Sequence, residues 1–211
     1  DLPLLRDRIA GVLYGQLVGD ALGCPVEGWS PAKIAATYGR LDAMEVATER
    51  WRPAGLHSDD GQQSLALCDA LLDSPEAPER ALAATFVDVF VGAPKRKDSF
   101  GLHRGTGRGF RAAVRALVEG AAPQEAGQAS SSNGVAMMIA PAACRWYDDL
   151  DRLRDVVIRV GRVKQRAVPG IAGAGAVAFV AAHGLRCGGY GDLDGGELLG
   201  FTRAVESEAT E

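Results

Sequence analysis

The chain has 211 residues, of which 47% are hydrophobic, 24% charged and only 6% aromatic, a composition typical of a soluble globular domain with a sizeable core. Its 23 Lys and Arg residues against 27 Asp and Glu residues give a formal net charge of −4, which argues against a broad surface for nucleic acid or anionic membranes. The four cysteines form no CxxC pair and no secretion-signal pattern opens the chain, so we expect buried thiols in a cytoplasmic protein. The sequence does not indicate an oligomeric state.

Apolar residues recur at helical spacing along almost the whole chain, whereas no alternating strand pattern is found. In chain order, this spacing predicts helices over about residues 5–23, 31–39, 58–72, 74–90, 110–120, 135–142, 150–160, 170–183 and 198–205. Abundant Ala and Gly residues suit helices that pack closely against each other. We therefore expect a compact all-α fold with one active face.

One stretch, residues 167–185, carries no formal charge over 19 residues, which is long enough to cross a bilayer. Pro169 and several glycines interrupt it, and few of its residues are large and apolar. A buried core helix is therefore predicted, and no membrane is expected as a partner.

The first motif that could carry chemistry is GDALGCPVE at residues 19–27, where Asp20 and Glu27 flank a helix end broken by Gly and Pro. One interpretation is that both are solvated loop charges. However, Asp20 falls on the helix face that includes Leu13 and Leu17. A carboxylate that ends an apolar stripe must be paired or functional if it is buried.

The second motif is HSDDGQQ at residues 57–63, immediately before the third predicted helix. Ser58 is a favoured N-cap residue, and Asp59 and Asp60 in the first turn complement the helix dipole. The alternative is that the hydroxyl and the two carboxylates are hard oxygen ligands for Mg²⁺ or Mn²⁺.

Two further motifs lie in loops. Residues 101–110, GLHRGTGRGF, could wrap backbone N–H groups around a phosphate, with Arg104 or Arg108 adding charge, or could be a plain flexible loop. Residues 130–138, SSSNGVAMM, place Asn133 and Gly134 at the start of an apolar helix, which is ordinary capping chemistry when considered alone. The chain has three histidines and neither a GxSxG nor an HExxH motif, so a nucleophilic triad is not expected.

Taken in order, four segments form a recognisable set: GDALGCPVE at 19–27, HSDDGQQSLAL at 57–67, HRGTGRG at 103–109 and SSNGVAMMIAPAA at 131–143. Together they resemble the ADP-ribosylglycohydrolase family, and the resemblance covers most of the chain to about residue 146. It implies one domain over residues 1–211, an orthogonal all-α helical array, and a cleft that holds ADP-ribose beside two Mg²⁺ or Mn²⁺ ions. The implied reaction is hydrolysis of the bond between ADP-ribose and a modified protein side chain or small molecule.

The resemblance also implies roles for particular residues. Ser58, Asp59 and Asp60 match metal ligands, and Glu27, near the scissile ribose, is implied to be catalytic together with Asp60. The implied substrate-binding residues are Asp20, Gly107, Gly109, Ser132, Asn133, Gly134 and Met137. Two cations bridged by carboxylates can orient the ribose hydroxyls and lower the pKa of a bound water, so this chemistry needs no histidine and no covalent nucleophile.

The sequence departs from the family pattern at several positions. Gly61 stands where the family usually has Thr, Met138 where Arg is common, and residues 163–166 where a Thr-His pair is usual. The chain also ends before the region of the family's Asp-x-Asp-Thr motif, so half of the implied metal ligands are absent. Asp192 and Asp194 superficially resemble that motif, but the residues after them predict the start of a helix.

These departures leave alternatives open. The chain is either a fragment of a longer protein, expected to be incomplete at its C-terminal end, or a naturally shortened relative. Its function is then either hydrolysis, or binding of ADP-ribose or a nucleotide without turnover, or a structural role like that of the crystallin with this fold. Two bound divalent ions would favour hydrolysis, and one weakly bound ion would favour binding without turnover. A chain that binds no ion would favour the structural role.

Overall fold

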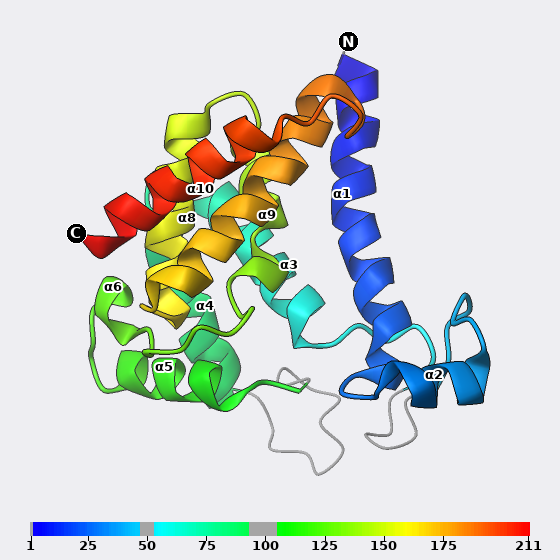
Figure 1. Ribbon diagram of the computed structural model, residues 1–211. Coiled ribbons are helices and arrows are strands. Elements are labelled where there is room, and N and C mark those ends of the chain that lie inside the picture. The colour runs from blue at the N-terminus through cyan, green and yellow to red at the C-terminus, as the bar shows by residue number, and fades with distance from the viewer. Residues whose placement is uncertain (1, 47–52, 93–104) are drawn as a thin grey trace.

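The computed structural model describes residues 2–46, 53–92 and 105–211. Every regular element in these ranges is a helix (Figure 1). The elements are α1 (Leu2–Gly23), the 3₁₀ helix η1 (Cys24–Val26), α2 (Pro31–Tyr38), α3 (Asp59–Asp73), α4 (Pro78–Gly92), α5 (Arg108–Val118), α6 (Pro123–Ala126), the 3₁₀ helix η2 (Ala136–Met138), α7 (Ala140–Trp146), α8 (Leu150–Lys164), α9 (Val168–Cys187) and α10 (Gly195–Thr210). The only β-type pairing within the described ranges is an isolated bridge between Gln128 and Gln165. The expected all-α fold class is confirmed.

Three differences between the predicted and the observed helices lie where the structure has a proline near a helix start. The fourth helix begins at Pro78 rather than at residue 74, because Ser74 and Ala77 form a turn in which the Ala77 N–H donates to the Ser74 carbonyl (3.1 Å). The helix predicted over 135–142 is two elements, η2 and α7, because Pro141 has no N–H to continue the helical hydrogen bonds. The short α6, which also has a proline in its first turn, was not predicted.

The core is formed by buried residues of α3, α4, α5, η2, α7, α8, α9 and α10, and α8 and α9 are its largest contributors. α9 packs against α7, α8 and α10, and α8 adds the buried Val156, Val157 and Val160. Gly175 of α9 lets α10 approach closely, since a Cβ at this position would stand 2.9 Å from Cγ2 of Val205. The predicted buried helix over 170–183 is thereby confirmed as the centre of the fold.

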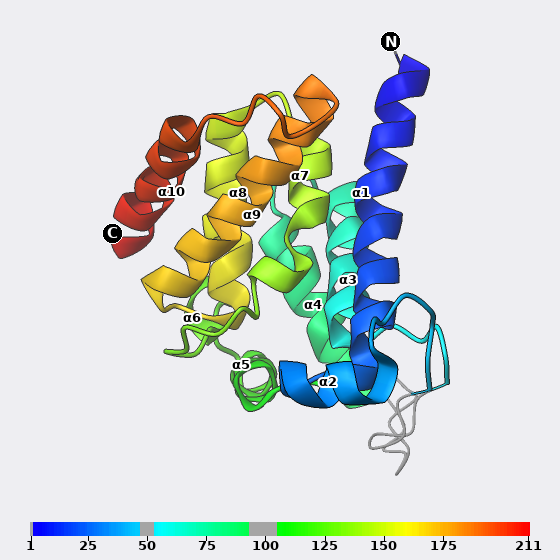
Figure 2. The ribbon, with the colours of Figure 1, turned by 45° about the vertical axis from the view of Figure 1, so that its right-hand side comes forward.

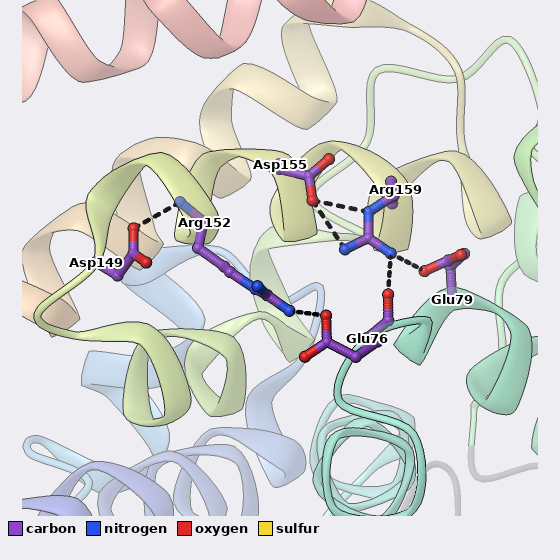
Figure 3. A network of polar contacts seen from close by, with 6 residues as sticks. All are labelled: Glu76, Glu79, Asp149, Arg152, Asp155 and Arg159. Carbon is purple, nitrogen blue, oxygen red and sulfur yellow. Dashed lines mark hydrogen bonds and ion pairs between the residues drawn. The ribbon is translucent and has the colours of Figure 1, made fainter.

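A surface network joins α8 to the segment that leads into α4 (Figure 3). The Arg159 guanidinium donates to a Glu79 carboxylate oxygen at 2.6 Å, to the Glu76 carbonyl at 3.1 Å and to Asp155 at 3.0 Å. Arg152 adds an ion pair with the Glu76 carboxylate. These contacts hold the start of α4 against α8, and the last residue of α8 lines the candidate site.

Figures 1 and 2 place α1 at one side of the molecule and α10 at the opposite side. The C-terminal end of α1, the first turn of α3 and α5 lie at the same end of the structure (Figures 1 and 2). The motifs singled out from the sequence therefore lie at one end of the helical array.

Candidate active site

A cavity of about 860 Å³ opens at this end of the fold, between the end of α1, the start of α3, the start of α5, residues 130–137 and the last residue of α8. It is lined by every candidate site residue named from the sequence: Asp20, Glu27, Ser58, Asp59, Asp60, Gly107, Gly109, Ser132, Asn133, Gly134 and Met137. Asp20 and Asp60 lie 40 positions apart in the chain, yet they share one cavity. The structure thus brings the candidate residues together, while their roles stay predictions.

The start of α3 is held by two side-chain acceptors. The Ser58 hydroxyl accepts a hydrogen bond from the Asp60 N–H (3.2 Å), so Ser58 is the N-cap that its residue type indicates. Asp20 reaches across from α1, and its Oδ2 accepts from the N–H groups of Ser58 (2.9 Å) and Gly61 (2.8 Å). The carboxylate that ends the apolar stripe of α1 is therefore paired, and it fixes the backbone that carries Asp59 and Asp60.

The carboxylates around the start of α3 repel one another. Burial is the largest cause that raises the pKa of Asp60 from 3.8 to about 6. The charges of Asp59, Asp20 and Glu27 contribute to the same rise, while Lys164 opposes it. A site that disfavours its own negative charge in this way is suited to a cation or to a group that donates hydrogen bonds.

Lys164 of α8 is a cavity-lining cation whose role the sequence did not predict. Its side chain is only 6% exposed, and its ammonium donates to the Gly134 carbonyl (2.6 Å) and to the Gln63 side-chain carbonyl. Burial lowers its pKa to about 8, and the nearby Asp59 and Asp60 act in the opposite direction. Gln63 in turn donates from Nε2 to Oδ2 of Asp59 at 2.9 Å.

Gly61, one of the departures from the family pattern, has a local explanation. A Cβ here would stand 2.8 Å from Nδ1 of His57, 2.8 Å from Cδ2 of Leu17 and 3.0 Å from Oδ2 of Asp20. The side chains of α1 and the His57 ring therefore occupy the space that a larger residue at position 61 would need.

The glycine and serine segments form another wall of the cavity. Gly107 is the N-cap of α5, and its side of the helix is open, since no atom lies within 4 Å of where a Cβ would be. Gly134 is constrained instead, with the Lys164 Cε 3.0 Å from its Cβ position. Arg108 lines the cavity, whereas Arg104 and the rest of residues 101–104 lie outside the described residues.

The acidic groups offer the oxygen donors that Mg²⁺ and Mn²⁺ prefer, but the set is incomplete. Among the residues that the structure describes, no three or more His, Cys, Asp or Glu side chains are grouped so that they could hold a metal ion. Asp194 is the N-cap of α10, accepting from the Gly196 N–H at 2.6 Å, and neither it nor Asp192 lines the cavity. The predicted helix start at this pair is confirmed.

Three polar residues of the site were missed from the sequence: Gln16, Gln63 and Lys164. The Gln16 side chain accepts from the Ser64 hydroxyl (2.8 Å) and donates to the Met137 carbonyl, which joins α1 to α3 and to η2. Lys164 follows Val157 and Val160 at helical spacing, so the sequence places a cation at the end of a buried apolar stripe. This pattern could have indicated that Lys164 is buried.

The fold and the cavity define a class: an all-α domain with a cavity whose acidic residues gather around one helix start. The sequence profile of the ADP-ribosylglycohydrolase family matches residues 1–209. The chain belongs to the ADP-ribosylglycohydrolase family, as its four motifs had indicated.

Individual relatives are more distant. The chain is 27% identical over 179 residues to the uncharacterized protein YegU of Escherichia coli K12, a match that covers 82% of this chain and 52% of the relative. It is 27% identical over 150 residues to the ADP-ribosylhydrolase ARH3 of Danio rerio, covering 70% of this chain and 40% of the relative. The solved structure of an ADP-ribosylglycohydrolase-related protein complex matches with a TM-score of 0.69 at 24% identity, over 86% of this chain and 57% of that one, which supports the fold. The chain spans about half the length of the curated relatives that it matches.

Proposed function

We propose that this chain carries the ADP-ribose-binding part of a metal-dependent hydrolase that cleaves the glycosidic bond between ADP-ribose and a modified side chain or a related acceptor. The observation that carries the proposal is the convergence of Glu27, Asp59 and Asp60 on one cavity, where mutual repulsion and burial hold the pKa of Asp60 near 6. The cavity volume of about 860 Å³ lies within the range of roughly 300–1,000 Å³ that is usual for small-molecule sites.

The proposed ligands of Mg²⁺ or Mn²⁺ are Ser58, Asp59 and Asp60. A bound divalent ion supplies charge that orients sugar hydroxyls and acidifies water. These three residues provide fewer than the about six oxygens that Mg²⁺ seeks, so water, substrate or further residues would supply the rest.

The remaining cavity residues act on the sugar and the water. Glu27 is the proposed proton acceptor for the attacking water, because it faces the acidic cluster from the segment after η1. Asp20 keeps the start of α3 in place through its two backbone hydrogen bonds. Gly107 and Gly109 leave room for the ligand to approach the backbone, and Ser132 and Asn133 offer polar contacts.

A second candidate function is binding of ADP-ribose without turnover. The incomplete group of acidic side chains among the described residues favours it. The cavity, with its cluster of acidic side chains, favours either of these roles over a purely structural one.

The test is calorimetry with ADP-ribose in millimolar Mg²⁺, followed by release of ADP-ribose from a modified peptide. We expect binding by the 211-residue chain and weaker binding by Asp59→Asn and Asp60→Asn, with slow turnover or none. Absence of ADP-ribose binding would contradict the proposal. Robust turnover that is lost in Glu27→Gln would instead show that these residues suffice for hydrolysis and would refute the second candidate.

A further inference from the structure

The Lys164 ammonium has an unusual position for a lysine, because it is buried at the wall of an acidic cavity. Two of its three N–H groups have oxygen acceptors, the Gly134 carbonyl at 2.6 Å and the Gln63 side chain. The Met137 sulfur lies 3.8 Å away, at the distance of a weak acceptor. Burying a cation is costly, and an apolar residue of similar length would pack here without that cost. The fold therefore does not require a lysine at position 164.

The ammonium determines which way the Gln63 amide points. Gln63 is 3% exposed and has one carbonyl oxygen and one NH₂ group at nearly equivalent positions. A cation can only be faced by the carbonyl oxygen, so the NH₂ group is directed to the other side. There it donates to Oδ2 of Asp59 at 2.9 Å. Lys164 thus makes Gln63 a donor to a carboxylate that would otherwise repel its carbonyl oxygen.

The same ammonium connects two walls of the cavity. It contacts Gln63 of α3, 101 positions away in the chain, and through the Gly134 carbonyl it holds the segment that carries Ser132 and Asn133. Gly134 can lie this close because it lacks a Cβ, which would stand 3.0 Å from the Lys164 Cε.

We propose that Lys164 is a positioning residue that acts through Gln63 to fix the orientation of the Asp59 carboxylate and through Gly134 to hold the opposite wall of the cavity. This role of Lys164 rests on the proposed function, in which Asp59 is a candidate metal ligand. The relay itself is a property of the protein without any ligand, so it is testable separately. Outer partners of this kind commonly contribute about 10-fold to 100-fold in metal affinity.

The first experiment measures solvent exchange of the Gln63 side-chain amide protons by ¹⁵N NMR in metal-free buffer. We expect exchange about tenfold faster in Lys164→Met than in the wild type, because the amide is then free to turn away from Asp59. Lys33→Met, which removes an exposed ammonium on α2, is the matched control and should leave the exchange unchanged. Equal exchange in Lys164→Met and the wild type overturns the proposal. If Lys164→Met fails to fold, Lys164→Gln, which keeps one donor group, should give a smaller acceleration.

The second experiment titrates Mn²⁺ alone, followed by electron paramagnetic resonance. Removing a nearby cation should strengthen Mn²⁺ binding if Lys164 acts only through its charge. Positioning predicts the opposite sign, with binding about tenfold weaker in both Lys164→Met and the neutral substitution Gln63→Leu. Tighter binding in Lys164→Met overturns the proposal.

The double variant Gln63→Leu with Lys164→Met distinguishes one relay from two separate effects. If both residues act on Asp59 through the same contact, the double variant should bind Mn²⁺ within about twofold of Gln63→Leu alone. If the double variant instead loses Mn²⁺ affinity by the product of the two single losses, the relay is overturned. A wild-type chain that binds no Mn²⁺ contradicts the metal site of the proposed function, and the amide exchange then decides the relay by itself.

Discussion

The two long apolar helices, α1 and α9, have similar compositions but opposite surroundings. By length and hydropathy both could cross a membrane, yet 56% of the residues in the apolar window of α9 are buried, against 17% in that of α1. α9 is covered by α7, α8 and α10, whereas α1 lies at the side of the molecule (Figures 1 and 2). Apolar content therefore does not decide which helix becomes the core.

The inward side of α1 is attached by polar contacts. Arg8 donates to the carbonyls of Leu185 (2.9 Å) and Arg186 (3.2 Å) at the end of α9, while Gln16 and Asp20 bind the site segments. The exposed side of α1 carries large apolar residues instead, namely Leu4 (48% exposed), Tyr14 (69%) and Val18 (52%). The comparison indicates that α9 is placed by packing and that α1 is placed by hydrogen bonds that also build the cavity.

Among the variants that should still fold, enlargement of Gly175 should have the largest effect, because it tests packing at α9. In Gly175→Leu the new side chain meets Val205, which is fully buried, so we expect a loss of about 2–3 kcal/mol. For a chain of this size the loss lowers the Tm by roughly 5–10 °C, measured by circular dichroism. Gly11→Leu on α1, where no atom lies within 4 Å of the Cβ position, is the control and should not lower the Tm. Equal destabilisation by the two substitutions would contradict the difference between the helices.

Removing the Asp20 carboxylate should come next, because it tests the polar attachment of α1. Asp20→Ala leaves the N–H groups of Ser58 and Gly61 without their acceptor, and we expect a cost of about 2 kcal/mol in chemical denaturation. Asp7→Ala removes an exposed carboxylate from the same helix and serves as the control. If the two variants are equally stable, hydrogen bonding at Asp20 does not hold α1 in place.

Neutralising Asp60 should have a smaller effect that depends on pH. Its pKa is raised from 3.8 to about 6 in the folded chain, first by burial and then by Asp59, Asp20 and Glu27. The folded chain therefore holds this proton more tightly than the unfolded chain, and the resulting stabilisation is complete below about pH 4 and lost as the pH rises through 6. In EDTA, Asp60→Asn should have a higher Tm than the wild type at pH 7 and the same Tm near pH 4. A constant difference over this range would contradict the raised pKa.

Local signals in the sequence predicted much of the site. Ser58, Asp59 and Asp60 stand next to each other at a helix start, so capping and a charge cluster could be read from three residues. Asp20 was placed on the face of Leu17, and both side chains indeed approach Gly61. Gln63 and Lys164 were not paired, because their contact joins positions 101 residues apart and nothing local indicates it.

The polar partners of α1 could not be predicted for a similar reason. Helical periodicity places Leu13 and Leu17 on the inward side of α1, where both are half-buried. It does not indicate which groups the polar residues of that helix will meet. Arg8, Gln16 and Asp20 find theirs on α9, η2 and α3, which requires knowledge of the assembled fold.

Substitution on the exposed side of α1 should have the smallest effect on this chain. Tyr14→Lys replaces a side chain that is 69% exposed, and the new lysine is a good helix former. We therefore expect the free energy of unfolding to change by no more than about 0.5 kcal/mol. Because Tyr14 does not line the cavity, ADP-ribose affinity should also be unchanged. The matched substitution inside the core, Phe179→Lys in α9, should prevent folding, since it buries an unpaired cation at a position that is 2% exposed. A loss of several kcal/mol in Tyr14→Lys would mean that the apolar side of α1 is covered in solution, and analytical ultracentrifugation at two concentrations would then show whether a second copy covers it.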